Sequence, residues 1–139
     1  MRRFFDTNVL VYMFDEGAPE KQDLARRHFR AAVADGSFVI STQVLQEFHV
    51  AVTRKLQTPV PPEAAEAALE EFFRLPVVLV DTTMIGAAAR TSRLHTVSFW
   101  DALIIEAAQA AGSSELLSED LQEGRRFGSL VLTNPFHTG

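Results

Sequence analysis

The sequence contains no cysteine, so it can form no disulfide, no zinc site with thiolate ligands and no cysteine nucleophile. It also lacks any apolar run near the length of about 18 residues that a membrane-spanning helix needs. The first apolar run follows Arg2 and Arg3 and ends almost at once, at Asp6, which is unlike a signal peptide. Together these absences predict a cytoplasmic protein with no membrane partner.

Positive charge is scarce: 13 Lys and Arg stand against 18 Asp and Glu, which gives a net charge of −5. This balance argues against a protein that binds nucleic acid through an extended basic surface. The argument is limited, because a divalent metal in an acidic pocket reverses the sign of the local charge. Basic side chains also cluster locally, at residues 26–30, 54–55, 90–93 and 125–126.

The overall composition is that of a soluble globular protein, with 47% hydrophobic and 22% charged residues in a chain of 139. That length suits a single domain over residues 1–139. The only proline-dense stretch, at residues 58–62, is interpreted as an internal connection because neither side alone has a full alternation of elements.

Short apolar strands alternate with longer helices along the chain. Strands are expected directly before Asp6 and at 38–40, 75–80, 116–117 and 130–132, and helices at 9–14, 20–34, 43–56, 63–74, 82–94 and 99–111. Thr82 or Thr83 is the expected N-cap of the fifth helix and Ser98 that of the sixth. The alternation predicts an α/β fold with a short, mainly parallel central sheet covered by helices.

Two acids follow predicted strands at the points where the strands end. Asp6 comes directly after Phe4 and Phe5, and Asp120 follows the strand at 116–117, with Glu119 as the alternative acid there. The carboxyl ends of parallel strands meet at one edge of a sheet, where ligands bind in open α/β folds. The alternative for Asp6 is a turn-forming or helix-capping role.

Two further acids lie on predicted helices. Glu47 sits at the rim of the apolar face of the helix at 43–56, a placement that fits either a cleft residue or an ordinary solvated one. Asp101 falls in the first turn after Ser98, where it would favour the helix dipole and also project beyond the sheet edge. Carboxylates from two strand ends and two helices are a plausible cage for Mg²⁺ or Mn²⁺, which prefer oxygen ligands. Neutral groups that orient the acids would come from Thr7, Asn8 and Ser118.

Four fragments occur in order along nearly the whole chain: FDTN at residues 5–8, Glu47, WDALI at residues 100–104 and LSED at residues 117–120. Their order and spacing resemble the PIN-domain family, most closely the ribonuclease toxins of VapBC toxin–antitoxin pairs. The resemblance implies a three-layer α/β/α fold and an endoribonuclease that hydrolyses RNA with Mg²⁺ or Mn²⁺. It equates Asp6, Glu47, Asp101 and Asp120 with the metal-binding acids of the family, and Ser118 with a hydroxyl residue near the last acid.

The resemblance also implies partners. Such toxins form homodimers and bind a small antitoxin whose segment occupies the acidic cleft, so an antitoxin arginine or lysine is expected there. Phe14, Phe72 and Phe73 are candidate interface residues, with the hydrophobic core as the alternative. Either Glu47 or Asp120 would act as proton acceptor; the sequence does not choose between them.

The residues argue against several other functions, and two alternatives remain open. A haloacid-dehalogenase-type phosphatase requires a second aspartate where Asn8 stands, and a response-regulator receiver requires adjacent early acids. No phosphate-binding loop or dinucleotide fingerprint occurs, and the four scattered histidines share no zinc-ligand spacing. The open alternatives are an RNA- or protein-binding module of the same fold, and an RNA-processing nuclease outside a toxin–antitoxin system.

Overall fold

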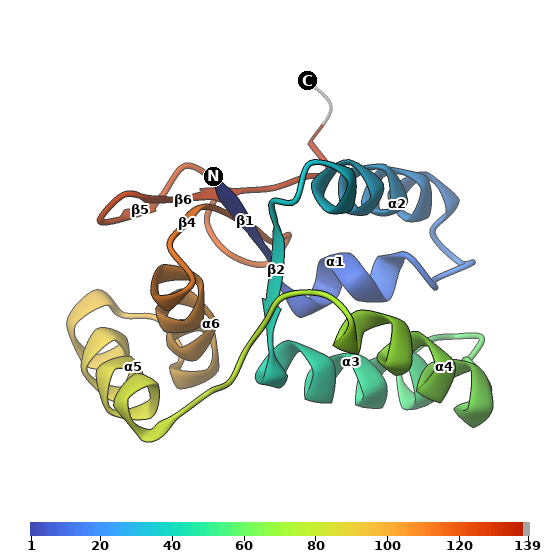
Figure 1. The fold of residues 1–139 in the computed structure, drawn as a ribbon, viewed down its shortest axis with the longest axis horizontal. Helices are drawn as coiled ribbons and strands as arrows, with labels where there is room; N and C mark the ends of the chain where they lie inside the picture. The colour runs from blue at the N-terminus through green and yellow to red at the C-terminus, as the bar shows by residue number, and fades with distance from the viewer. Residues whose placement is uncertain (138–139) are drawn as a thin grey trace.

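The computed structural model describes residues 1–137, and within them the chain forms six strands and six helices, with two helices after each of the first three strands. The strands are β1 (Arg2–Phe5), β2 (Phe38–Ser41), β3 (Val77–Val78), β4 (Ser113–Leu117), β5 (Arg126–Phe127) and β6 (Leu130–Thr133). The helices are α1 (Thr7–Tyr12), α2 (Pro19–Ala34), α3 (Thr42–Arg54), α4 (Pro62–Phe73), α5 (Thr82–His95) and α6 (Phe99–Ala110). Figure 1 shows α5 and α6 on one side of β2 and α1 to α4 on the other.

The strands form one sheet in the order β3-β2-β1-β4-β6-β5. All neighbouring pairs are parallel except β5 with β6, so the α/β fold with a mainly parallel sheet covered by helices is confirmed. The chain leaves β1 toward β2 on one side and later returns to β4 on the other. The carboxyl ends of β1 and β4 therefore border the point where the strand order reverses, which is the usual ligand position in such sheets.

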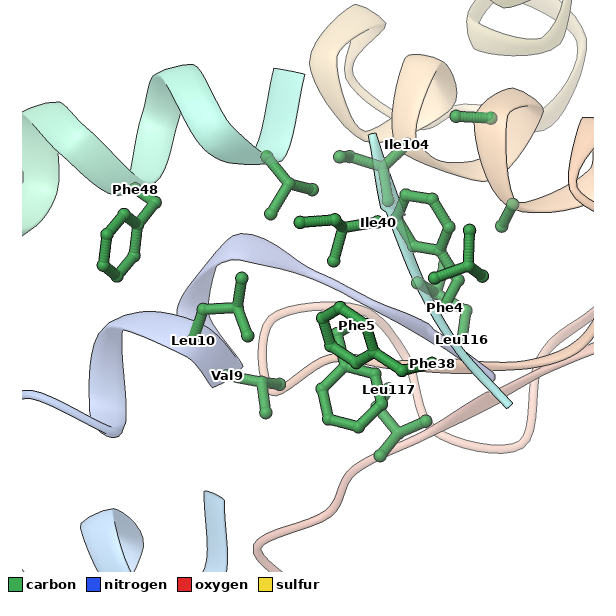
Figure 2. Close-up of a cluster of buried hydrophobic side chains, with 14 of the residues drawn as sticks. Phe4, Phe5, Val9, Leu10, Phe38, Ile40, Phe48, Ile104, Leu116 and Leu117 are labelled. Carbon is green, nitrogen blue, oxygen red and sulfur yellow. The ribbon is translucent and has the colours of Figure 1, made fainter. Parts of the chain in front are cut away.

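The core forms because the central strands are apolar on both faces, as a sheet covered on both sides requires. Phe4 and Phe5 are fully buried, and the ring centroid of Phe5 lies 4.9 Å from that of Phe38 on the neighbouring strand. Figure 2 shows these rings gathered with Ile104 from α6 and Leu116 from β4. Helices from both sides thus hold β1 rigidly, and with it the residue that follows it.

One of the proposed interface aromatics belongs to this core. Phe72 is 3% exposed and packs edge-on against Phe48 at a centroid distance of 5.2 Å, so the core alternative is confirmed for this residue. Phe14 packs on the same ring at 5.3 Å, whereas Phe73 is 54% exposed. In the part of the chain that the structure describes, no helix has the length and apolar character needed to cross a membrane.

The predicted strand at 75–80 is much shorter than expected. Only Val77 and Val78 pair with β2, because Pro76 has no N–H to donate and β3 is the edge of the sheet. Leu79 turns outward and is 72% exposed. The N-cap of α5 also differs: Asp81, rather than Thr82 or Thr83, accepts the hydrogen bond from the amide of Met84 at 2.9 Å.

The antiparallel strand β5 is not among the strands predicted from the sequence. It has two residues and pairs with β6 across a tight turn at Gly128, whose φ of 61° suits glycine. The first helix was also placed too late: α1 begins at Thr7 rather than Val9, because the Asp6 side chain caps it.

Candidate functional site

A cleft of about 720 Å³ opens at the carboxyl ends of β1 and β4. Its walls come from α1, α3, the start of α6 and the segment that follows β4. Six carboxylates line it: Asp6, Asp15, Glu47, Asp101, Glu119 and Asp120. The four acids singled out from the sequence therefore share one cleft, although they are up to 114 positions apart in the chain.

Asp6 forms the floor of the cleft. The β1 strand ends one residue before it, and its side chain is 6% exposed. Its Oδ1 accepts a hydrogen bond from the Thr7 amide at 2.7 Å, which caps α1, and its Oδ2 accepts one from the Ser118 hydroxyl at 2.7 Å. The helix-capping role considered from the sequence is therefore real, and it occupies only one of the two carboxylate oxygens.

The environment of Asp6 opposes its negative charge. Burial raises the pKa of this carboxyl from 3.8 to about 6, although the hydrogen bonds from Ser118 and Thr7 act to lower it. The negative charges of Glu47 and Asp101, which line the same cleft, raise the pKa of Asp6 further. A cation in the cleft would relieve this cost.

Asn8 joins the two strand ends. Its Nδ2 lies 3.0 Å from Asp120 Oδ2, 3.3 Å from Ser118 Oγ and 3.5 Å from Asp6 Oδ2. Its Oδ1 accepts a hydrogen bond from the Glu119 amide at 3.1 Å. One amide side chain therefore ties the segment after β4 to the end of β1.

Glu47 lies half-buried on α3 and is held at both oxygens. Thr7 Oγ1 donates to Oε1 at 2.7 Å, and Gln43 Nε2 donates to Oε2 at 3.2 Å. Gln43 Nε2 also lies 3.2 Å from the carbonyl oxygen of Trp100, which ties α3 to the start of α6. Gln43 is 5% exposed, and its Oε1 has no hydrogen-bond partner within residues 1–137.

Asp101 enters the cleft from the first turn of α6. Ser98 is the N-cap, as predicted, and its Oγ accepts the Asp101 amide at 3.0 Å. The carboxylate is therefore placed by helix geometry, and no side chain of the described residues donates a hydrogen bond to it. An acid in this position also favours the positive end of the helix dipole.

The two acids after β4 have different surroundings. Asp120 is exposed and receives Asn8, whereas Glu119 accepts a 2.7 Å hydrogen bond from the Tyr12 hydroxyl and pairs with Lys21. Desolvation acts to raise the pKa of Glu119, but the hydrogen bonds from Lys21 and Tyr12 prevail and lower it. Since Glu119 already has a cation as partner, Asp120 is the acid of this pair that remains for a metal.

The donor set suits a hard cation, but it does not form a closed cage. Within residues 1–137, no three His, Asp or Glu side chains converge closely enough to hold one ion by themselves. Mg²⁺ commonly keeps several waters and takes only one or two carboxylates, so an open acidic cleft with oxygen donors fits it. Asp6, with its buried and destabilised charge, is the central candidate ligand.

Sequence reasoning missed Gln43 and Tyr12 as residues that shape the cleft, and it noted Lys55 only as part of a local basic cluster. Gln43 precedes Glu47 by one helical turn, a spacing that predicts a shared face of α3. Lys55, at the end of α3, brings a positive charge to a cleft with six acids. Tyr12 carries no signal of its own, because its partner Glu119 lies 107 positions later.

Several solved structures have a similar fold. Among solved structures, VapBC2 from Rickettsia felis bound to a promoter DNA fragment has a TM-score of 0.68 and 20% identity, covering 96% of this chain and 98% of that one. DNA-bound VapBC from Salmonella typhimurium has a TM-score of 0.67 and 23% identity, with coverages of 97% and 98%. VapC20 from Mycobacterium tuberculosis, a sarcin-ricin loop cleaving toxin, has a TM-score of 0.63 and 19% identity, with coverages of 82% and 86%.

These similarities concern the fold. No curated protein matches the sequence. A model of the PIN domain, however, matches residues 3–125. Because this match spans most of the chain, the protein belongs to the PIN domain family.

Proposed function

We propose that this protein is a divalent-metal-dependent endoribonuclease that hydrolyses RNA phosphodiester bonds. The observation that carries the proposal is the buried carboxylate of Asp6, placed at the strand-order reversal in a cleft with Glu47, Asp101 and Asp120. Keeping such a charge buried among other acids is costly unless a cation occupies the cleft. Membership of a nuclease family adds independent support.

Each acid has a role consistent with its surroundings. Asp6 and Asp101 would hold Mg²⁺ or Mn²⁺, with Glu47 and Asp120 completing the set directly or through water. When bound, the ion supplies Lewis acidity that lowers the pKa of an attacking water and stabilises negative charge on the phosphate. Ser118, Thr7 and Asn8 keep the carboxylates in place by donating hydrogen bonds to them.

The proton acceptor is best assigned to Asp120. Both oxygens of Glu47 accept hydrogen bonds from Thr7 and Gln43. Asp120 accepts one from Asn8 at Oδ2, and among the described residues nothing donates to its Oδ1. Its exposed side chain can therefore receive a proton and release it to solvent.

We further propose that the protein is the toxin of a toxin–antitoxin pair of the VapBC type, with a cognate antitoxin as partner and a homodimeric assembly. Support comes from the structural neighbours, which include toxin–antitoxin complexes from Rickettsia felis and Klebsiella pneumoniae. The acidic cleft is electrostatically suited to an arginine or lysine of an antitoxin segment. RNA is the proposed substrate in the absence of that segment.

The test is cleavage of cellular RNA by the purified protein. We expect cleavage with Mg²⁺ or Mn²⁺, none with a chelator, and loss of at least about a hundredfold in Asp6→Asn. Asp23→Asn, an exposed acid paired with Arg27 on α2, is the matched control and should cleave like wild type. Sequencing the RNA ends after induced expression of wild type and Asp6→Asn would then identify the target. Equal cleavage by Asp6→Asn and wild type would refute the site.

A second candidate is a binding module of the same fold that does not cleave. The observation in its favour is that no three acids converge on one position within residues 1–137. Such a protein would bind RNA or a protein partner equally well in wild type and Asp6→Asn, and Mg²⁺ would produce no new RNA ends. An RNA-processing nuclease would differ from a toxin in cleaving without arresting growth.

A further inference from the structure

The cleft runs along α3, and one face of this helix lines it. The lining positions include Gln43, Glu47, Ala51 and Lys55, which recur every four residues, and Lys55 directly follows the last turn of the helix. Twelve positions at a rise of about 1.5 Å span roughly 18 Å. Gln43 and Glu47 lie beside the turn that carries Asp101, because Gln43 Nε2 contacts both Glu47 Oε2 and the Trp100 carbonyl, and Lys55 lies at the opposite end of α3.

An exposed indole stands at the acidic end. Trp100 is 62% exposed, lines the cleft and directly precedes Asp101. Because Trp100 lines the cleft as well as being exposed, its ring is accessible to a ligand that binds there. The Phe99 ring packs edge-on against the indole at a centroid distance of 5.2 Å, which supports one side of it.

The backbone under this indole is fixed relative to the acids. Gln43 Nε2 bridges the Trp100 carbonyl and Glu47 Oε2 at 3.2 Å each. The same turn of α6 is capped by Ser98. Trp100 is therefore presented at a set position beside the carboxylates, as a preorganised binding surface requires.

We propose that a single-stranded segment of RNA runs along α3, with an unpaired base next to the scissile phosphate stacked on Trp100 and a more distant phosphate bound by Lys55. The inference rests on the proposed ribonuclease function and adds how the substrate lies. Aromatic side chains stack on any base, and a lysine neutralises a backbone phosphate without reading sequence. Within residues 1–137, no carboxylate lies in salt-bridge range of Lys55.

This arrangement predicts a preference for single strands. In a duplex the bases are already stacked and paired, so a flat indole gains little from them. In a loop or unpaired segment, one base can turn out onto Trp100. A protein with net charge −5 would then bind RNA through stacking and a small number of cationic contacts rather than through a broad basic surface.

The chain offers a direct probe, because Trp100 is its only tryptophan. In the Asp6→Asn background with Mg²⁺, a single-stranded oligoribonucleotide should change the tryptophan fluorescence, and a duplex of equal length should change it much less. In the otherwise wild-type enzyme, Trp100→Ala should raise KM by about tenfold or more, and Trp100→Phe should recover most of the loss. Leu94→Ala removes a comparably exposed side chain outside the cleft, 59% exposed, and should leave KM unchanged.

The proposed contact between Lys55 and a backbone phosphate is tested by the salt dependence of RNA binding. Lys55→Met should reduce the slope of log binding constant against log salt concentration by about 0.7, the value for one phosphate contact with a single strand. Arg54→Met removes the same charge from the adjacent residue, which does not line the cleft, and should leave the slope unchanged.

Three results would overturn the inference. If wild type cleaves RNA and Trp100→Ala has the KM of wild type, the substrate does not stack there. If Trp100→Ala instead alters the oligomeric state without changing RNA affinity, Trp100 contacts a second copy of the chain. A wild-type protein that neither binds nor cleaves RNA with Mg²⁺ would refute the ribonuclease function itself, and the inference with it.

Discussion

Replacing Asp6 by asparagine should stabilise the metal-free protein while removing its proposed activity. The carboxyl is buried, and its pKa lies near 6 instead of 3.8. At neutral pH it is ionised in both the folded and the unfolded chain, so folding bears the cost of burying the charge. The difference of about two pKa units corresponds to about 3 kcal/mol. Asparagine can still accept the Thr7 amide that caps α1.

The stability difference between Asp6→Asn and wild type depends on pH. Because the folded-state pKa is raised, the penalty is absent below about pH 4, grows as the pH rises toward 6 and is complete above it. Asp6→Asn should therefore be more stable than wild type by up to about 3 kcal/mol at pH 7.5, or about 10 °C in Tm for a chain of this size. The advantage should vanish near pH 4. Thermal unfolding in chelator across this range measures it.

Two controls make the result specific. Asp120→Asn removes an exposed charge and should change stability by less than about 1 kcal/mol. Added Mg²⁺ should stabilise wild type more than Asp6→Asn, because an ion that binds only the folded state raises its stability. If Asp6→Asn were less stable than wild type at pH 7.5 in chelator, the buried charge would not be a cost, and the reasoning that assigns a cation to this cleft would fail.

Three further substitutions test the surroundings of the site. Asn8→Ala removes the amide that joins the ends of β1 and β4, and steady-state kinetics should show activity lower by about 10- to 100-fold. Ser98→Ala removes the N-cap of α6, so denaturant unfolding should give a loss of about 1 kcal/mol, with weaker metal binding as the turn that carries Asp101 loosens. Lys21→Met leaves Glu119 without its cation, and titration followed by NMR should find the pKa of Glu119 higher than in wild type, with stability at neutral pH lower by less than about 1 kcal/mol.

The floor of the site could be predicted from the sequence because its signals are local. Asp6 follows two aromatic residues, and Asp120 follows Leu116 and Leu117, so strand ends and polar turns are visible without tertiary information. Asp101 was placed by its spacing from Ser98. Parallel pairing of β1 with β4 then brings the two strand ends together.

The walls depend on contacts that no local pattern encodes. The hydrogen bond from Gln43 to the Trp100 carbonyl spans 57 positions, and the position of Lys55 at the far end of the cleft follows from how α3 packs beside α1. The edge strands β3 and β5 have two residues each, too few for periodicity to be recognised. They form because a neighbouring strand offers hydrogen-bonding groups.

The backbone of the site continues the ladder of the central strands. The Asp6 amide donates to the Leu117 carbonyl at 2.9 Å, and the Ser118 amide donates to the Thr133 carbonyl at 2.9 Å. Exposing these amides to solvent requires parting the middle of the sheet, so their hydrogen exchange should be as slow as global unfolding. Any motion that displaces Asp6 or Ser118 must therefore first break the pairing between the central strands, so the floor of the cleft is as stable as the sheet itself.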